Sequence, residues 1–289
     1  MMTVKQLNTI KLPFALKAVR NFQFPHKHGI LRRIYDGVLA KNGVAWVETS
    51  AGLDWKLDLN ISNHRSLVYG DYEGNGQVRW MKRWLSEGGI IVDSGANIGQ
   101  TLIYFLQSPQ TKVLCIEPVP ECVAWLNECI NAGDFNDRVT VINALFDESE
   151  GKTELKVAGE GDTGEWSTVH TDWFERLQTK TISCEAITLD ALLDERNVSS
   201  VRFWKLDVEG AELRALLGAR QSLSRQMIDA LLVEIIPENS EPVNELMNSY
   251  GYVAYQITNK GELERLSTAN HCSDLVGNCL YLPLEEPVN

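Results

Sequence analysis

Carboxylates that follow short apolar runs are the residues of this sequence best placed to do chemistry. Asp207 ends the apolar run 201–206, and Glu209 comes two residues later. Glu234 lies near the end of a second apolar run, 230–236. A carboxylate in a cleft can take the proton from a reacting hydroxyl, and several together can hold a divalent cation. The three acids therefore predict a site for proton transfer or for a metal ion.

Three roles are open for this acid cluster. In the first, Asp207 or Glu209 is a general base that removes a proton from an acceptor. In the second, Asp207, Glu209 and Glu234 share a cation, and oxygen ligands alone suit Mg²⁺ or Ca²⁺. In the third, Glu209 and Glu212 are structural, because acids in the first turn of a helix interact favourably with its dipole; one of them then pairs with Lys205.

Two histidines are further candidates for a general base, because imidazole changes its charge near neutral pH. His170 lies in the polar stretch 151–183 and is the second choice after the acids. His64 lies in the N-terminal segment and is also a candidate to overhang a cleft, although a single histidine is more often a surface or packed residue. Trp166 and Trp173 are candidates for an acceptor platform beside His170, although tryptophans in loops more often simply pack.

A turn with two glycines, Asp93 to Gly99, follows a short apolar run. Gly95 would let the backbone approach a ligand with no Cβ in the way, and Gly99 would let the next helix pack close to the strand. Asn97 replaces the second glycine of the dinucleotide pattern, and Asp93 would repel a pyrophosphate. An acid there suits instead the amino group and the sulfonium of a methionine moiety.

Glu117 ends the next apolar run along the chain. A carboxylate at that strand end can accept hydrogen bonds from both hydroxyls of a ribose, which dinucleotides and S-adenosylmethionine both carry. The turn and Glu117 together therefore predict a nucleoside-containing cofactor at one edge of a sheet.

The elements that must position these residues alternate between apolar strands and helices from residue 90 onward. Strands are expected at 90–92, 112–116, 138–142, 201–206, 230–236, 252–257 and 278–282, and helices at 100–106, 120–132, 188–195, 211–217 and 242–250. Nearly continuous apolar strands separated by helices predict a parallel sheet that is buried on both faces. The last two strands are placed as a closing hairpin.

The chain divides into two parts, because the alternation of apolar strands and helices is absent from the first eighty or so residues. Residues 1–80 are predicted to form a cap or lid, with an amphipathic helix within 1–24 and a hairpin of strands 44–48 and 55–59. Residues 81–289 are predicted to be the catalytic domain, with a surface insertion at about 151–186, and a helix predicted at 78–85 closes the cap segment at this boundary.

Composition indicates an ordinary globular protein with a small-molecule partner. The 289 residues carry a net charge of -12, which disfavours binding to a nucleic acid, because that requires clustered basic residues. No apolar run approaches the roughly 20 residues that cross a bilayer, so no membrane association is expected. The N-terminus lacks the features of a signal peptide, and the six cysteines suit free thiols, so a cytoplasmic location is expected. No feature sets the oligomeric state.

Four blocks of sequence resemble, in order, those of FkbM-type methyltransferases. They are Val92–Gly99, Ile116–Pro118, Thr188–Leu192 and Lys205–Glu212. The resemblance runs from about residue 72 to residue 282, and the last block is its most specific part. It implies a class I methyltransferase (Rossmann-like) α/β sheet of six parallel strands and an antiparallel seventh. It also implies S-adenosylmethionine as methyl donor and, usually, a hydroxyl acceptor on a natural product or sugar.

The resemblance also assigns cofactor contacts to individual residues. Asp93, Gly95 and Asn97, in the turn that Gly99 closes, would surround the methionine part of the cofactor. Glu117 would bind its ribose, and Asp147 is the candidate partner for the adenine amino group. Ser94 stands where the family usually has valine.

These features together predict an S-adenosylmethionine-dependent O-methyltransferase that acts on a small hydroxylated natural product or sugar. An N-methyltransferase would not need the acid cluster to take a proton from a hydroxyl. A non-catalytic domain that keeps the cofactor pocket is a second alternative. A dinucleotide oxidoreductase is a distant third, because its glycine pattern is missing.

Overall fold

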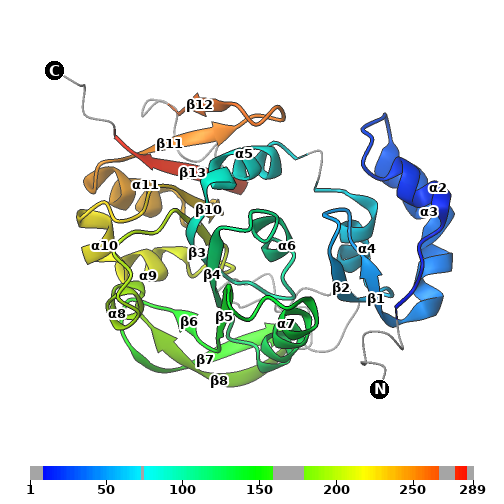
Figure 1. Ribbon diagram of the computed structural model, residues 1–289. Coiled ribbons are helices and arrows are strands. Elements are labelled where there is room, and N and C mark those ends of the chain that lie inside the picture. Colours follow the sequence, from blue (N-terminus) through cyan, green and yellow to red (C-terminus); the bar gives the residue numbers. More distant parts are fainter. Residues whose placement is uncertain (1–8, 73–74, 159–178, 267–276, 285–289) are drawn as a thin grey trace.

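The centre of the protein is an eight-stranded sheet, seen in a computed structural model that describes residues 9–72, 75–158, 179–266 and 277–284 (Figure 1). Its strands are β3 (Gly89–Ser94), β4 (Thr111–Ile116), β5 (Val139–Ile142), β9 (Phe203–Leu206), β10 (Leu231–Ile235), β11 (Tyr252–Ile257), β12 (Leu263–Arg265) and β13 (Gly277–Pro283). They lie in the order β12-β11-β13-β10-β9-β3-β4-β5.

The strand directions confirm the predicted arrangement. Neighbours from β5 to β10 pair in parallel, whereas β13 pairs antiparallel with both β10 and β11. Six strands therefore run one way, and β13 is the antiparallel seventh. The short edge strand β12, antiparallel to β11, was not predicted from the sequence. The strand expected at 201–206 begins only at Phe203, because Val201 forms an isolated bridge with Ile228.

Helices cover both faces of this sheet, as its apolar strands require. One face packs against α5 (Gly76–Trp84), α6 (Leu102–Phe105) and α7 (Pro120–Gly133); the other packs against α8 (Leu189–Glu195), α9 (Glu212–Leu217), α10 (Arg220–Ser224) and α11 (Ser240–Ser249). Successive strand residues alternate between the two cores: Ile91 belongs to the first and Val92 to the second. The helix predicted at 100–106 is shortened to α6, because the turn Asp93 to Gly99, which we call the cofactor turn, is followed by turn residues up to Thr101.

The predicted insertion forms a small second sheet below the main one (Figure 1). Strands β7 (Gly151–Ala158) and β8 (Thr179–Ile187) pair antiparallel, and β6 (Leu145–Phe146) pairs in parallel with β8. His170, Trp166 and Trp173 lie outside the described residues.

The N-terminal part forms two α-helices, a one-turn helix, a hairpin and a third α-helix. They are α2 (Phe14–Val19), α3 (Lys27–Leu39), the one-turn helix Ala40–Asn42, β1 (Val44–Glu48), β2 (Asp54–Asp58) and α4 (Ser62–Tyr69). The hairpin is confirmed, but the described part of the helix expected within 1–24 is only the six residues of α2. Trp55 and Leu57 of β2 are buried in the same core as α6 and α7, so this part packs on the main sheet.

The described residues contain neither a membrane-crossing helix nor a disulfide. None of their helices is long and apolar enough to span a bilayer. Five cysteines have free thiols, as expected, and Cys272 lies outside the described residues. Cys122 and Cys129 both point from α7 into the interior, where they pack as small apolar side chains.

Candidate active site

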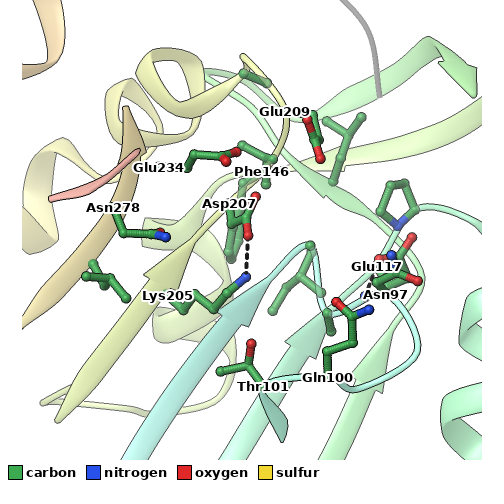
Figure 2. A pocket seen from close by; sticks show the side chains of 18 of the residues that line it. Asn97, Gln100, Thr101, Glu117, Phe146, Lys205, Asp207, Glu209, Glu234 and Asn278 are labelled. Atoms are coloured by element: carbon green, nitrogen blue, oxygen red, sulfur yellow. Dashed lines mark hydrogen bonds and ion pairs between the residues drawn. The ribbon is translucent and has the colours of Figure 1, made fainter. Parts of the chain in front are cut away.

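A cavity of about 410 Å³ opens at the carboxyl ends of the parallel strands, beside the turn after β3 (Figure 2). This volume is in the range of small-ligand sites, and the location is the one at which open α/β sheets bind ligands. Its walls come from the cofactor turn, the ends of β4, β9 and β10, the insertion, β13, α5 and the N-terminal part. Among the predicted residues, Gly95, Asn97, Glu117, Asp147, Asp207, Glu209 and Glu234 line it.

The cofactor turn is shaped by two close approaches within the protein. Gly95 has φ +73°, and a Cβ added there would overlap the carbonyl oxygen of Asp207. Gly99 has φ +88°, and an added Cβ would lie 2.7 Å from Cζ2 of Trp55. The expectation that Gly99 allows close packing on the strand was therefore wrong, since its close neighbours are Trp55 of the hairpin and Leu126 of α7. Trp55 also donates its indole N–H to the Ile98 carbonyl (2.7 Å).

We expect Gly95→Ala to lower the free energy of unfolding by about 2–4 kcal/mol, because a side chain at this positive φ meets backbone that cannot move without separating β3 from β9. Denaturant unfolding would measure the change. Gly37→Ala is the matched control: an added Cβ in α3 has no neighbour within 4 Å, so alanine should raise stability by up to about 1 kcal/mol. Equal losses in both variants would contradict the argument.

Glu117 ties the cofactor turn to the second strand. Its buried carboxylate accepts the backbone N–H of Asn97 at 2.8 Å and that of Val119 at 2.9 Å (Figure 2). Burial raises its pKa to about 7, against the lowering effect of these two hydrogen bonds. Each carboxylate oxygen can accept a second hydrogen bond, so Glu117 still has acceptor sites for ribose hydroxyls. Its contact with a ribose stays a prediction. The structural role of the carboxylate was not predicted.

Asp93 lies beneath the turn rather than in the cavity wall. Its side chain is fully buried, and neither carboxylate oxygen has a hydrogen-bond partner among the described residues. Burial raises its pKa to about 6, although the Lys205 ammonium, 4.0 Å from Oδ1, opposes this effect. Its predicted contact with the methionine part of the cofactor stays a prediction.

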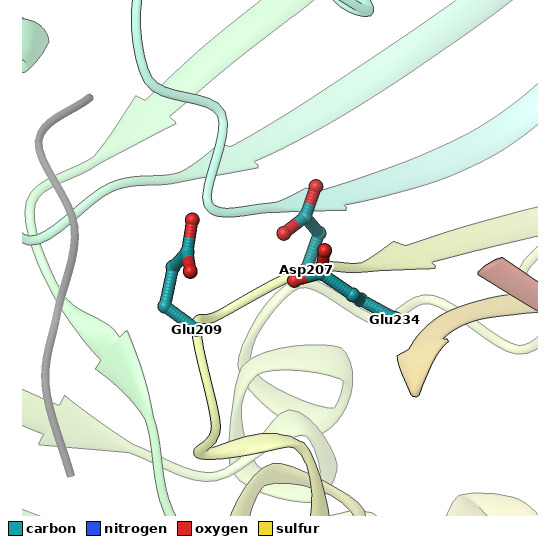
Figure 3. Close-up of side chains that lie close together, drawn as sticks. All are labelled: Asp207, Glu209 and Glu234. Atoms are coloured by element: carbon teal, nitrogen blue, oxygen red, sulfur yellow. The ribbon is translucent and has the colours of Figure 1, made fainter. Parts of the chain in front are cut away.

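The predicted acid cluster is assembled at the ends of β9 and β10 (Figure 3). Carboxylate oxygens of Asp207, Glu209 and Glu234 all lie within 4.8 Å of one another. The Lys205 ammonium donates to Oδ2 of Asp207 at 2.9 Å, as the dashed line in Figure 2 marks. Glu209 is exposed and has a left-handed backbone (φ 53°), which turns its side chain toward the other two acids.

Within this cluster one carboxyl is ionised and another holds a proton. Burial raises the pKa of Glu234 to about 9, and the charge of Asp207 and a hydrogen bond between the two carboxyls add to this effect. Burial alone would raise the pKa of Asp207, but the Lys205 ammonium and the hydrogen bond from Glu234 outweigh it and lower that pKa. At neutral pH Asp207 is therefore a carboxylate at the cavity wall.

Glu212 has the structural role that the third interpretation gave it, but with different partners. Its buried carboxylate accepts the backbone N–H groups of Val208 and Gly210, each at 3.1 Å, and the side-chain amide of Asn239 at 2.6 Å. It thereby fixes the loop that carries Glu209. The expected pairing of Lys205 with a helix acid was wrong, because Lys205 binds Asp207 instead.

Asp147 lies in the cavity wall and is engaged by a neighbour. Its two carboxylate oxygens accept from Nε and Nη2 of Arg214 in α9, both at 2.7 Å. Two parallel charge-assisted hydrogen bonds fix the carboxylate, so that an adenine amino group would have to use its remaining lone pairs. Its role toward adenine stays a prediction.

His64 packs in the N-terminal part and does not line the cavity. It is buried, its Nδ1 accepts the backbone N–H of Asp58 at 2.9 Å, and its ring packs edge-on against Trp125. Burial lowers its pKa to about 4, against the opposing charge of Asp58. It is therefore a neutral structural histidine, and the expectation that it overhangs the cleft was wrong.

The pKa of His64 predicts a loss of stability in mild acid. Its folded-state pKa, about 4, lies below the unfolded value of 6.5, so the unfolded chain takes up a proton first as the pH falls. The free energy of unfolding should drop by up to about 3 kcal/mol between pH 6.5 and pH 4. His64→Asn keeps an acceptor for the Asp58 N–H but does not titrate, and should remove that part of the loss in urea titrations. His26→Asn, at an exposed site, should not.

Several wall residues had no signal in the sequence. Lys205 was seen only as a partner of structural acids. Asn278 of β13 lies opposite Glu234 in the sheet register, although the two are 44 positions apart. Further polar and aromatic wall residues come from other elements: Asn63, Tyr72, Asn75, Gln77, Gln100, Thr101 and Tyr104. Gln100, Thr101 and Tyr104 come just after the cofactor turn in the sequence, whereas long-range packing brings the other four to the cavity.

The strand order and the cavity at the ends of β3, β4 and β9 define the class of this protein: it has a class I methyltransferase fold. Residues 93–254, more than half of the chain, match the methyltransferase FkbM domain. The chain therefore belongs to the FkbM methyltransferase family and is a methyltransferase. Fold and family imply S-adenosylmethionine as the methyl donor.

Individual relatives are distant. The 2-O-methyltransferase NoeI of Sinorhizobium fredii (strain NBRC 101917 / NGR234) is 27% identical over 147 residues, which are 47% of this chain and 59% of that protein. The match thus spans less than two thirds of its length. The METTL16 MTase domain has a TM-score of 0.46 at 11% identity, covering 99% of this chain and 86% of that one. Precorrin-6y C5,15-methyltransferase from Geobacter metallireducens GS-15 has a TM-score of 0.36 at 11% identity, and the match covers 73% of this chain and 87% of that one.

Proposed function

We propose that this protein is an S-adenosylmethionine-dependent O-methyltransferase that transfers a methyl group to a hydroxyl of a small natural product or sugar. The observation that carries this proposal is the ionised Asp207, which lies in the cavity wall close to the cofactor turn and is held there by Lys205. A hydroxyl is a weak nucleophile until a base takes its proton, whereas a neutral amine needs no such base. The cluster therefore favours the hydroxyl acceptor over an amine.

The residues near the turn fit the cofactor. The backbone of Gly95 to Asn97 and the carboxylate of Glu117 would hold its amino-acid and ribose parts, and the buried carboxylate of Asp93, which has no hydrogen-bond partner among the described residues, suits a cationic group nearby. S-adenosylmethionine supplies an electrophilic methyl group, and a hydroxyl acceptor becomes a methyl ether.

The chain's own residues then handle the proton. Asp207 accepts it from the acceptor hydroxyl at a carboxylate oxygen. Lys205 keeps Asp207 ionised and oriented by its hydrogen bond to Oδ2, and the Glu234 carboxyl hydrogen-bonds to Asp207. Because methyl transfer is an in-line displacement, holding the two reactants in line is the other task of the cavity wall.

A divalent cation is the competing role for the same acids. Asp207, Glu209 and Glu234 would bind Mg²⁺ or Ca²⁺, and the buried, unpartnered Oε2 of Glu234 is available as a ligand. The Lys205 ammonium beside Asp207 already supplies a positive charge there, which disfavours a second one. Dialysis against EDTA separates the two roles: a general base keeps its rate, whereas a cation site loses it and regains it with added Mg²⁺ or Ca²⁺.

The proposal is tested by assaying methyl transfer from S-adenosylmethionine to matched hydroxyl and amine acceptors, among them methyl glycosides and amino sugars. We expect S-adenosylhomocysteine release with hydroxyl acceptors and an O-methyl product in mass and NMR spectra. Methylation of amines alone would establish the N-methyltransferase alternative. Cofactor binding in calorimetry without turnover on any acceptor would favour a non-catalytic domain, and binding of NAD alone would overturn the cofactor assignment.

A further inference from the structure

The N-terminal part of the chain has a charge opposite to that of the rest. Residues 1–44 contain eight lysines and arginines and a single acid, Asp36, so they carry +7, whereas the whole chain carries -12 and the remaining residues therefore -19. Asp36 is engaged inside the protein, where Oδ1 accepts from Arg65 (2.8 Å) and from the Tyr69 hydroxyl (2.7 Å). Acids of the hairpin and of the segment after α4 offset part of this charge, because Glu48 binds Lys17 and Asp71 binds Arg32, while Lys11, Arg33 and Lys41 are exposed basic side chains.

The same part carries nearly all of the large exposed apolar side chains. Among the described residues, six of the seven lie between positions 14 and 44: Phe14, Phe22, Ile30, Ile34, Val38 and Val44. Phe14 is 87% exposed, Phe22 69% and Ile34 57%. Single exposed apolar residues are common on protein surfaces, but a concentration of them indicates an interaction site.

Three of these exposed apolar residues lie on one face of α3. Ile30, Ile34 and Val38 are spaced four apart and point outward, while Leu31 and Leu39 fill the core from the opposite side. Arg33 and Gly37 of α3 are also exposed, as is Lys41 in the one-turn helix Ala40–Asn42 that directly follows α3. We call the six residues Ile30, Arg33, Ile34, Gly37, Val38 and Lys41 the α3 outer face. It alternates apolar and basic side chains and contains no acid.

Its place in the fold leaves this face open. Helices α2 and α3 lie at the edge of the protein, beyond the β1–β2 hairpin and α4, far from the main sheet (Figure 1). Phe14 is the first residue of α2, and Phe22 lies between α2 and α3 in the chain.

We propose that the α3 outer face, with Phe14 and Phe22, docks on an anionic lipid surface. Aromatic and branched side chains can enter the headgroup region, while Arg33, Lys41 and Lys11 meet the lipid phosphates. A nucleic acid would use the basic residues but would leave the apolar ones in water. A second copy would bring two segments of the same positive charge together, which is unfavourable. This is peripheral contact and requires no membrane-spanning helix.

The test is co-sedimentation of the full-length protein with vesicles of phosphatidylcholine and phosphatidylglycerol (3:1) or of phosphatidylcholine alone. We expect binding to the anionic vesicles that is at least about tenfold stronger than to the neutral ones and that weakens in 0.5 M NaCl. Equal binding to both, or to neither, would overturn the proposal.

Matched variants locate the contact. Ile34→Glu and Arg33→Glu should each lower vesicle binding about tenfold, because one removes an apolar anchor and the other reverses a charge at the surface. Leu284→Glu and Lys112→Glu change exposed residues of the same types outside the N-terminal part and should leave binding unchanged. Thermal melting checks that all four variants fold.

Two other occupants give distinct results, and either would replace the lipid. A dimer in analytical ultracentrifugation that Ile34→Glu dissociates, without vesicle binding by the wild type, identifies a second copy. Binding to duplex DNA or RNA that Arg33→Glu weakens and Ile34→Glu does not, again without vesicle binding, identifies a nucleic acid.

Discussion

Asp207→Asn is expected to lower the rate of methyl transfer about a thousandfold while leaving the affinity for S-adenosylmethionine nearly unchanged. Asparagine keeps the shape of the side chain but cannot accept a proton, and general-base groups contribute roughly 10²- to 10⁴-fold to a rate. The rate falls and the cofactor affinity does not, because the Asp207 side chain binds Lys205 and does not hold the cofactor turn in shape. Glu117 holds that turn through its hydrogen bond with the Asn97 N–H.

Rate and affinity have to be measured separately for this variant. Single-turnover methyl transfer gives the rate, and calorimetry with S-adenosylhomocysteine gives the affinity. Glu154→Gln is the control, since Glu154 is an acid of the same cavity wall outside the cluster, and it should keep most of the wild-type rate. A rate for Asp207→Asn within a few-fold of wild type would exclude Asp207 as the base.

The second large effect is expected at Glu117, where alanine should weaken S-adenosylmethionine binding about a hundredfold. Charge-assisted hydrogen bonds contribute about 1.5–3 kcal/mol each, and every 1.4 kcal/mol of binding free energy changes the affinity tenfold. Loss of the ribose contacts therefore lowers the affinity strongly by itself. Removal of the carboxylate also leaves the N–H groups of Asn97 and Val119 without their acceptor, so the turn loses its shape.

Calorimetry and thermal melting would separate these two contributions. Glu117→Gln can still accept one of the two backbone hydrogen bonds and should fall between alanine and wild type in both measurements. Glu121→Ala is the control: this exposed glutamate lies in the first turn of α7 and pairs with Lys180 on the surface. If the cofactor binds equally well to Glu117→Ala, the assignment of the ribose site fails.

Local pattern was enough to predict the sheet and the order of its motifs. Apolar runs ending in Asp93, Glu117 and Asp207 identified parallel strands, because only buried strands are apolar on both faces. The carboxyl ends of such strands share one edge, so the acids there were expected to converge, and Asp207, Glu209 and Glu234 do. The antiparallel position of the last strand followed from the family resemblance and is confirmed by its pairing with β10.

Interactions between side chains could not be predicted in the same way. Asp147 gave no sign that Arg214, 67 positions away, would bind its carboxylate. His64 was a candidate base only because nothing in its neighbourhood along the chain indicates burial. Gly99 seemed to serve the strand beside it, yet it accommodates Trp55 of the N-terminal hairpin. In each case the deciding partner comes from a distant part of the chain.

The sequence by itself determined the cofactor turn, the family and the edge of the sheet where chemistry occurs, because these depend on residues that are neighbours in the chain or on strand alternation. Only the tertiary structure decided which carboxylate is charged. Lys205 lies on β9, Asp207 directly follows that strand and Glu234 lies on β10, so packing β9 against β10 in parallel brings the three groups together in a buried setting. Burial and the single ammonium then leave the proton on Glu234 and the charge on Asp207.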